Sequence, residues 1–489
     1  MRIDLYYAPG SPPCRVVLLL GKALGLNFNL KPISVQAKEN MTPEYLKINP
    51  QHCIPTIVDN GLNLWESRAI LTYLADRYGK DDSLYPKNLK KRALVDQRLY
   101  FDMGTLVPSI KEYFAKQILG KQLEADDLTK LENAYELLDK FLEGEEWVAG
   151  SNITVADYAI VVNVSVTEAY GSQGLGFDIS KYHNVTRWLS NAKKTMVGFS
   201  EIEGKGNEEL KKRVDALRAQ KNFFRLISFY LVSFSFCHAL SSIKCYKIAQ
   251  IQRLETVVGA SSKQLTKMTI DLYYAPGSPP CRVVLLLGKA LGLNFNLKAI
   301  SVRAKENFTP EYLKINPQHC IPTIVDNGLN LWESRAILTY LADRYGKDDS
   351  LYPKDLKKRA LVDQRLYFDI GTLVPSIRQY FLKQIFGRKL EADDITKLEN
   401  AFELLDKFLE GEEWVAGSNI TVADYAIVVN VSITEAYGLQ GLGFDISKYH
   451  NVTRWLSKAK KTMVGFSEIE GKGNEELKKW IDSVKAQKN

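Results

Sequence analysis

Apolar residues near the start of the chain follow a strand, helix, strand pattern. Ile3 to Ala8 is rich in β-branched and aromatic residues, which predicts a strand, and a second strand is predicted from Phe28 to Val35. The run Val16 to Leu24 between them is long and apolar enough for a buried helix. Pro12 and Pro13 suit its first turn, because the amide that proline lacks would be unpaired there.

A hairpin and a further helix follow. Ile54 to Val58 and Leu62 to Trp65 flank Asp59-Asn60-Gly61, a turn sequence typical of two antiparallel strands. A helix is predicted from Glu66 to about Tyr78. The order β-α-β-α-β-β-α predicts a small α/β domain over residues 1–82.

Helical spacing replaces the strand patterns in residues 88–222. Lys90 to Gly120 and Asp126 to Gly144 carry apolar residues at helical intervals, and Pro108 is expected to bend the first of these helices. Thr154 to Asp157 has the pattern of a capping box and precedes a mostly apolar segment, so a core helix is expected there. This part of the chain is predicted to be all-α.

The whole pattern occurs twice. Residues 268–489 align with residues 1–222 without a gap at an offset of 267, and 22 of the 222 positions differ. A repeat this long is a self-contained globular body and not a unit of a solenoid. We therefore expect an α/β domain at 268–349 and an all-helical domain at 355–489.

Residues 223–267 match neither copy. The stretch 223–243 is apolar and about long enough to cross a bilayer, but Arg225 and His238 interrupt it, so membrane insertion is not expected. The last four residues of the chain also end the first copy, and the second copy opens on Met268. We interpret the segment as an unstructured linker or as read-through sequence between two gene products.

Charge argues against a nucleic-acid partner. The net charge is +8, but residues 223–267 hold six basic residues and one acidic residue, which leaves about +3 for the two copies together. Nucleic-acid binding needs basic residues gathered on a folded face.

Cysteine usage indicates a reducing compartment. Each copy has two of the six cysteines, and no CxxC pair occurs. The N-terminus lacks the apolar core of a signal peptide, so a cytoplasmic location is expected.

Three short stretches carry candidate chemistry and recur unchanged in the second copy. They are Ser11-Pro12-Pro13-Cys14-Arg15, Gln51-His52-Cys53-Ile54-Pro55 and Glu66-Ser67-Arg68. Ser11 falls between a strand end and a helix start, where free backbone amides and the helix dipole would favour a negative charge. Its hydroxyl could stabilise a thiolate there; alternatively, Ser11 is an ordinary N-cap.

On these three stretches and the α/β-then-helical order, each copy resembles the insect delta-class (delta/epsilon-like) cytosolic glutathione transferases. The resemblance implies a thioredoxin-like domain that binds glutathione and an all-helical domain that supplies a hydrophobic substrate site. It implies conjugation of reduced glutathione to hydrophobic electrophiles, with no metal and no cofactor beyond glutathione itself.

The resemblance also assigns roles to residues. Ser11 and Ser278 would donate to the glutathione sulfur. Pro55 would be the cis-proline whose preceding residue pairs with the cysteinyl backbone of glutathione, and Glu66 with Ser67 would hold its γ-glutamyl end. The glutathione-binding residues are then His52, Cys53, Ile54, Pro55, Glu66, Ser67, Arg68 and their equivalents His319, Cys320, Ile321, Pro322, Glu333, Ser334 and Arg335.

Some of these roles have plain alternatives. His52 would contact the glycine end of glutathione, or else it is a surface or core histidine. Glu66 and Ser67, taken without the family, read as a helix cap. Cys14 is expected to be a small buried apolar residue, with a reactive thiol as the alternative.

The long helix offers candidates for the hydrophobic substrate pocket, with core packing as the alternative for each. The candidates are Met103, Tyr113 and Phe114 in the first copy and Ile370, Tyr380 and Phe381 in the second. The copies differ in this region, for example at Ala115 and Leu382, while the glutathione stretches are identical. We therefore expect different second-substrate preferences.

The resemblance leaves alternatives open. The same site could serve a glutathione-dependent peroxidase or isomerase, or the removal of HCl from chlorinated insecticides, and a non-catalytic ligand-binding module is the rival from another class. Family members pair as two-fold dimers, so a homodimer or an intramolecular pseudo-dimer of the two copies is expected.

Overall fold

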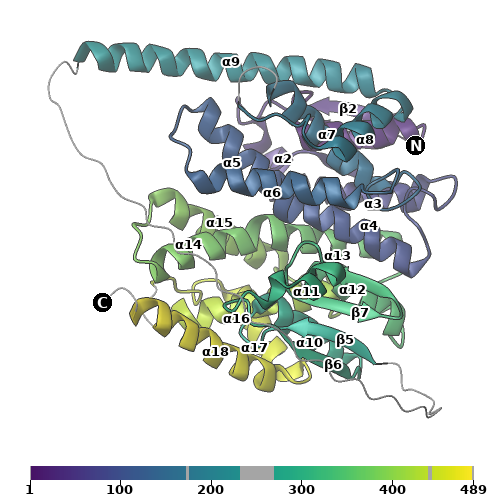
Figure 1. Ribbon diagram of the computed structural model, residues 1–489, viewed down its shortest axis with the longest axis vertical. Coiled ribbons are helices and arrows are strands. Elements are labelled where there is room, and N and C mark those ends of the chain that lie inside the picture. The colour runs from purple at the N-terminus through teal and green to yellow at the C-terminus, as the bar shows by residue number, and fades with distance from the viewer. Residues whose placement is uncertain (1, 172–175, 232–268, 439–442, 487–489) are drawn as a thin grey trace.

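The computed structural model describes residues 2–171, 176–231, 269–438 and 443–486. Each copy has an α/β domain followed by a helical domain, as the sequence predicted (Figure 1). The first copy occupies one end of the molecule and the second copy the other end, and helices from both domains of each copy meet between them.

Each α/β domain is built on a four-stranded mixed sheet. The strand order is β2-β1-β3-β4 in the first copy and β6-β5-β7-β8 in the second. The first pair in each copy is parallel and the other two pairs are antiparallel. The strands are β1 (Asp4–Tyr7), β2 (Asn29–Pro32), β3 (Thr56–Asp59), β4 (Leu62–Trp65), β5 (Ile270–Tyr274), β6 (Phe295–Ala299), β7 (Thr323–Asp326) and β8 (Leu329–Trp332).

Helices surround each sheet and form the rest of each copy. In the first copy they are α1 (Pro12–Ala23), α2 (Pro43–Ile48), α3 (Ser67–Tyr78), α4 (Leu89–Phe101), α5 (Val107–Ile118), α6 (Ala125–Phe141), α7 (Val155–Tyr170), α8 (His183–Thr195) and α9 (Phe199–Leu231). Their equivalents are α10 (Pro279–Ala290), α11 (Pro310–Ile315), α12 (Ser334–Tyr345), α13 (Leu356–Phe368), α14 (Val374–Ile385), α15 (Ala392–Phe408), α16 (Val422–Tyr437), α17 (His450–Thr462) and α18 (Phe466–Ala486).

Helix α7 is the centre of the first copy, as its apolar sequence predicted. The capping box forms: the Thr154 amide donates to Asp157 Oδ2 at 2.8 Å, and Asp157 is fully buried. Burial raises the pKa of Asp157 to about 6, although bonds from two backbone amides and from Trp188 oppose that rise. Helix α1 packs between α7 and α3, so the α/β and helical domains share one core.

The long predicted helix over Lys90 to Gly120 is interrupted. A π-helical turn, Asp102–Leu106, separates α4 from α5 just before Pro108. The cause is local, because proline has no amide hydrogen to continue the helical ladder and its ring crowds the preceding turn. Asp102, at the start of this turn, lies in the protein interior and is fully buried.

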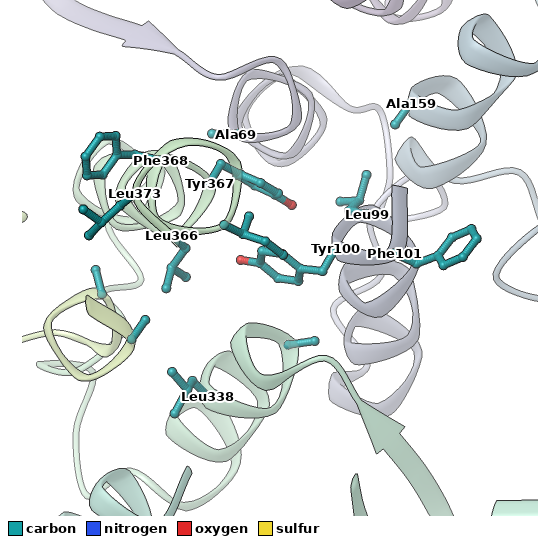
Figure 2. Close-up of a cluster of buried hydrophobic side chains, with 14 of the residues drawn as sticks. Ala69, Leu99, Tyr100, Phe101, Ala159, Leu338, Leu366, Tyr367, Phe368 and Leu373 are labelled. Atoms are coloured by element: carbon teal, nitrogen blue, oxygen red, sulfur yellow. The ribbon is translucent and has the colours of Figure 1, made fainter. Parts of the chain in front are cut away.

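The two copies contact each other through their helices. Helix α3 packs on α13, and α4 packs on α12. At the centre, the rings of Tyr100 and Tyr367 stack with centroids 4.9 Å apart (Figure 2). Lys90 Nζ donates to the Asn327 carbonyl, and the equivalent Lys357 donates to the carbonyl of Asn60 at 2.7 Å.

Helix α9 runs to Leu231, past the boundary at residue 222 that the sequence suggested for the first helical domain. The remainder of the predicted linker lies outside the described residues. Within the residues that the structure describes, no helix is both long and apolar enough to cross a membrane.

Candidate functional site

The sheet register brings the three predicted stretches to one end of each sheet. Tyr6 pairs with Thr56, so the loop that leaves β1 lies beside the loop that enters β3. Thr56 also pairs with Trp65, so the residue after β4 lies at the same end. Ser11, Pro55 and Glu66 follow or precede these paired residues by only a few positions. The stretches therefore share one edge of the sheet.

Ser11 lies directly before α1, half-buried and with an extended backbone at φ −83°. The expectation of free amides around it is wrong. Pro12 and Pro13 have no amide hydrogen, and the amides of Cys14 and Arg15 both donate to the Ser11 carbonyl, at 3.0 and 3.1 Å. An anion at this position would be stabilised by the Ser11 hydroxyl and by the dipole of α1, without free backbone donors.

Cys14 is fully buried behind Ser11. Burial raises the pKa of its thiol to about 11, with opposing contributions from Ser11, the Ala8 backbone and Arg15. The thiol is therefore protonated at neutral pH and behaves as a small apolar residue, as the sequence suggested.

The second stretch enters β3 through a tightly bonded loop. The Ile54-Pro55 bond is cis, as is Ile321-Pro322, in line with the prediction. The Cys53 carbonyl accepts bonds from the hydroxyl of Tyr45 at 2.6 Å and from Asn49 Nδ2 at 2.9 Å. These bonds fix the backbone of the residues before the cis-proline.

His52 has a left-handed backbone, with φ 45°, and its carbonyl accepts a bond from Asn40 Nδ2 at 2.8 Å. The equivalent His319 differs in its surroundings, although its own stretch is identical. The ring of Phe308 stacks on His319 with centroids 4.3 Å apart, and the first copy has Met41 at that position. Burial lowers the pKa of His319. The candidate sites of the two copies are thus similar but not equivalent.

Glu66 precedes α3 with φ 67°, a left-handed backbone that is uncommon for a residue with a side chain. Its carboxylate accepts a bond from Gln51 Nε2 at 2.7 Å, and Gln51 Oε1 accepts a bond from Trp65 Nε1 at 2.9 Å. Burial raises the pKa of Glu66, while Gln51 and Arg68 oppose that rise. An ordinary helix cap has an extended backbone and bonds the first turn, so that alternative does not describe Glu66.

Arg68 is buried and held from the helical domain. Its Nε donates to Asp102 Oδ2 at 2.9 Å, its Nη2 donates to the same oxygen, and its Nη1 donates to Ser67 Oγ at 3.1 Å. Asn163 Nδ2 donates to the other oxygen of Asp102 at 3.0 Å. Burial raises the pKa of Asp102, and Arg68 opposes the rise. Sequence reasoning missed Asp102, because no local pattern links it to a residue 34 positions away.

An apolar cavity of about 450 Å³ opens beside these residues in the first copy. Its walls come from the start of α1, from α5, from α7 and from α9. Phe114, one of the predicted pocket residues, lines it. The cavity is lined by Pro12, Pro13, Val16, Arg68, Val107, Ile110, Lys111, Phe114, Ala115, Ile118, Asn163, Val166, Tyr170, Leu210 and Val214.

The equivalent cavity of the second copy measures about 370 Å³, and the predicted Phe381 lines it. Five of its lining residues are larger than their equivalents: Arg378 replaces Lys111, Leu382 replaces Ala115, Ile433 replaces Val166, Ile481 replaces Val214 and Trp480 replaces Arg213. Trp480 lies edge-to-face with Phe386, with ring centroids 6.5 Å apart.

The other predicted pocket residues lie elsewhere. Met103 packs against the second copy, because a Cβ on Gly371 would come within 2.1 Å of its Cε. Ile370 likewise lies 2.9 Å from the position of a Cβ on Gly104. Tyr113 and Tyr380 are buried beside the two phenylalanines, in the core that backs the cavities: Tyr113 lies 5.2 Å from Phe114 between ring centroids. Met103 lies within the π-helical turn before α5, and this turn is at the contact between the copies.

A metal site is not evident. Among the described residues, no group of three His, Cys, Asp or Glu side chains is placed to hold a metal ion.

Two family models match the chain, and each matches it twice. The model described as glutathione S-transferase, N-terminal domain, matches residues 1–76 and 268–343. The model described as glutathione S-transferase, C-terminal domain, matches residues 101–193 and 372–459.

Similar solved structures come from insects. A delta-class glutathione transferase of Nilaparvata lugens is 48% identical, with a TM-score of 0.42, and the match covers 44% of this chain and 99% of that one. A Bombyx mori glutathione transferase is 45% identical over 43% of this chain and 96% of that one, with a TM-score of 0.41. An epsilon-class glutathione S-transferase from the housefly Musca domestica is 37% identical over 44% and 98%, with a TM-score of 0.40. Each relative is covered almost completely by less than half of this chain.

Proposed function

The chain belongs to the glutathione S-transferase family, with two tandem pairs of its N-terminal and C-terminal domains, and we propose that both copies are active centres. Members of this family use glutathione as a co-substrate and conjugate it. In our proposal, glutathione lies at the sheet end where the three stretches meet, and its sulfur faces the apolar cavity. The observation that carries this proposal is the convergence of Ser11, cis-Pro55 and Glu66 at one edge of the sheet, next to that cavity.

Ser11 and Ser278 are the proposed donors to the glutathione sulfur. Lowering the pKa of a thiol by two units needs about 2.7 kcal/mol of preferential stabilisation of the anion. With the amides at the start of α1 absent or bonded, most of this must come from one charge-assisted hydroxyl bond, assisted by the helix dipole. The thiolate then attacks an electrophilic carbon of an apolar compound in the cavity, forming a thioether and releasing the leaving group. Acting as a base, the same thiolate can remove HCl from a chlorinated compound.

Glu66 and Ser67 are the proposed partners of the γ-glutamyl end. Glu66 supplies a carboxylate for the amine, and Ser67 supplies a hydroxyl for the carboxylate. Arg68 lies next to them but is bonded to Asp102, so we assign it the role of fixing Ser67 and adding positive charge. The backbone of Ile54, held before the cis-proline, pairs with the cysteinyl residue of glutathione.

We propose that the two copies prefer different second substrates. The support is the cavity walls: the second cavity is smaller by about 80 Å³, and an indole stands where the first copy has an arginine. A flat aromatic electrophile suits the second copy because Trp480 offers it a stacking face. The wider first cavity suits bulkier or more flexible apolar compounds.

The two copies are proposed to form a pseudo-dimer within one chain. The support is the packing of α3 and α4 on α13 and α12, with Tyr100 stacked on Tyr367. Sedimentation of the purified chain is expected to give one particle of 55.4 kDa. A particle of twice this mass would show that copies pair between chains instead. We retain the cytoplasm as the proposed location.

The chemistry is tested by replacing both serines. Ser11→Ala with Ser278→Ala is expected to lower the turnover of chlorodinitrobenzene about 100-fold, a loss typical of removing one preorganised donor. In this variant, the pKa of bound glutathione, measured from the ultraviolet absorbance of its thiolate as pH is varied, should match the pKa of free glutathione. Ser190→Ala with Ser457→Ala, which changes two exposed serines, is the matched control. Unchanged thiolate absorbance in the first variant would refute the role of these hydroxyls.

A further inference from the structure

The Glu66 carboxylate stands at the end of a line of side chains that begins in the other copy. Gln51 bonds Glu66 at 2.7 Å and accepts a bond from the Trp65 indole at 2.9 Å. Trp65 is 5% exposed and Gln51 is buried as well. The bond from the indole therefore fixes the carboxamide oxygen of Gln51, which leaves its Nε2 directed at Glu66.

The outer face of the Trp65 indole is covered by the second copy. The ring of Phe408 lies 6.2 Å away between centroids, tilted by 36°. The guanidinium carbon of Arg365 lies 5.8 Å from the indole centroid and 3.7 Å from the centroid of Phe408. Arg365 is itself fixed, because its Nε donates to the Val415 carbonyl at 2.7 Å.

The same line occurs in the opposite direction. Gln318 Nε2 donates to Glu333 at 2.7 Å, and the Trp332 indole donates to Gln318 at 3.0 Å. The Trp332 ring lies 6.2 Å from Phe141 of the first copy, and the Arg98 guanidinium lies 3.7 Å over Phe141 and 5.7 Å from Trp332. Each copy therefore covers the tryptophan of the other copy with an equivalent phenylalanine and arginine.

We propose that each glutathione site is positioned by the opposite copy. Arg365 and Phe408 hold the Trp65 indole, the indole orients Gln51, and Gln51 aims the Glu66 carboxylate at the amine of glutathione; the mirror residues do the same for the other site. This inference rests on the proposed function, in which Glu66 binds the γ-glutamyl end. None of these residues except Glu66 touches glutathione, so they are positioning residues, and their loss raises the cost of ordering the carboxylate on binding.

The tandem chain allows a test that a homodimer would not, because one side can be changed alone. In the Ser278→Ala chain nearly all turnover is expected to come from the first copy, because the second copy is slowed about 100-fold. Arg365→Met, placed in the second copy, is expected to raise the first copy's KM for glutathione about 3- to 10-fold, the range for one lost hydrogen bond, while kcat at saturating glutathione stays within about 2-fold. Isothermal titration with glutathione should show the same loss of affinity at one of two sites.

The mirror variant Arg98→Met is the matched control. It breaks the equivalent contact but faces the silent second site, so in the same Ser278→Ala chain its effect on the KM for glutathione should be the smaller of the two. A merely structural role predicts the reverse, since Arg98 is packed within the first copy itself. A larger effect of Arg98→Met, or equal effects, would overturn the proposal.

Two further variants separate a failure of positioning from a failure of folding or of glutathione binding. Trp65→Phe keeps a ring against Phe408 but removes the donor to Gln51, so it should reproduce the rise in KM even if Arg365→Met fails to fold. Glu66→Ala should lower glutathione affinity more than either. If Glu66→Ala has no effect, the proposed function is wrong at that residue; if Glu66→Ala acts and both Arg365→Met and Trp65→Phe do not, only the positioning by the opposite copy is wrong.

Discussion

At the scale of single residues, the site depends on side chains fixed by partners far away in the sequence. Glu66 has a left-handed backbone, which costs of order 1 kcal/mol or more for a non-glycine residue and persists only where surrounding contacts impose it. Gln51 and Trp65 supply such contacts on one side. The buried pair of Arg68 and Asp102 supplies the other, by fixing the first turn of α3 against the helical domain.

The Arg68 and Asp102 pair gives a prediction about stability. Arg68→Met leaves a buried carboxylate without its cation, and this should lower the free energy of unfolding of the first copy by about 3–5 kcal/mol. Urea denaturation followed by circular dichroism measures the loss. Adding Asp102→Asn removes the unpaired charge, so the double variant should recover part of it. A double variant no more stable than the single one would contradict this account.

At the scale of elements, the last helix of each copy, α9 or α18, packs on the α/β domain and also lines the apolar cavity. Helix α9 crosses α1 closely enough that Gly206 lies against the Arg15 side chain, which is fully buried and bonded to Glu203 at 2.9 Å and to Asn207 at 2.7 Å. The equivalent α18 adds Trp480 to the wall of the second cavity. In each copy this helix therefore joins the two domains and lines the apolar cavity.

Two glycines of α9 should respond oppositely to alanine. A Cβ on Gly206 would lie 2.2 Å from Arg15 Cδ, so Gly206→Ala is expected to cost about 1–3 kcal/mol of stability through overpacking. Gly204 has nothing within 4 Å of its Cβ position, so Gly204→Ala should gain about 0.5–1 kcal/mol through helix propensity. Thermal unfolding of both variants measures the difference. Equal shifts of the two midpoints would refute the close approach of α9 to α1.

The indole of α18 should carry the aromatic preference of the second copy. In the Ser11→Ala chain, Trp480→Arg restores the residue of the first copy and should lower kcat/KM for chlorodinitrobenzene about 3- to 10-fold, the range of one aromatic contact. Turnover of an aliphatic enal should change less. The quantity to compare is the ratio of kcat/KM for chlorodinitrobenzene to kcat/KM for the enal, which Trp480→Arg should lower. Arg213→Trp in the Ser278→Ala chain is the reciprocal variant and should raise this ratio. An unchanged ratio in both chains would rule out Trp480 as the determinant.

At the scale of the whole molecule, the contact between the copies buries ionisable groups. Asp96 and Asp363 are both buried there, each accepts a bond from a tyrosine hydroxyl of its own copy at 2.7 Å, and Thr72 Oγ1 of the first copy donates to Asp363 at 3.4 Å. Burial raises the pKa of each carboxyl to about 7. Arg92, Arg359, Asp76 and Asp343 are the charged groups around them.

These carboxyls predict how stability depends on pH. An aspartate in the unfolded chain titrates near pH 4, so folding takes up protons between about pH 4 and about pH 7. The contribution of the two protonated carboxyls to the free energy of unfolding is fully present below that window and is lost as pH rises through 7. The free energy of unfolding falls by at most about 1.4 kcal/mol per pH unit for each group. Urea denaturation at several pH values measures the slope.

Asp96→Asn with Asp363→Asn is the matched variant, because asparagine keeps an acceptor for the tyrosine but cannot titrate. Its free energy of unfolding should fall less steeply with rising pH than that of the unaltered chain. Parallel curves for the two proteins would contradict the raised pKa values.

Local sequence patterns were enough for the order of elements and for the three stretches. The strands, the hairpin at Asp59 to Gly61 and the capping box at Thr154 all depend on neighbouring residues, and the structure confirms them. The prolines of the first turn of α1 were equally visible in the sequence, yet they remove the amides that were expected to bind an anion there. Helical or strand periodicity reports that a side chain is buried, but it does not report against what.

Contacts between residues far apart in the sequence could be identified only in the folded structure. Asp102 bonds a residue 34 positions earlier, Met103 packs on the second copy and not in the pocket, and Trp480 reaches the cavity from the last helix. Such contacts depend on how helices cross and where a proline interrupts them, and these are properties of packing rather than of local composition. Residue types and their spacing therefore defined which polar and apolar side chains each copy offers, while three-dimensional packing decided which of them lie together and from which copy their partners come.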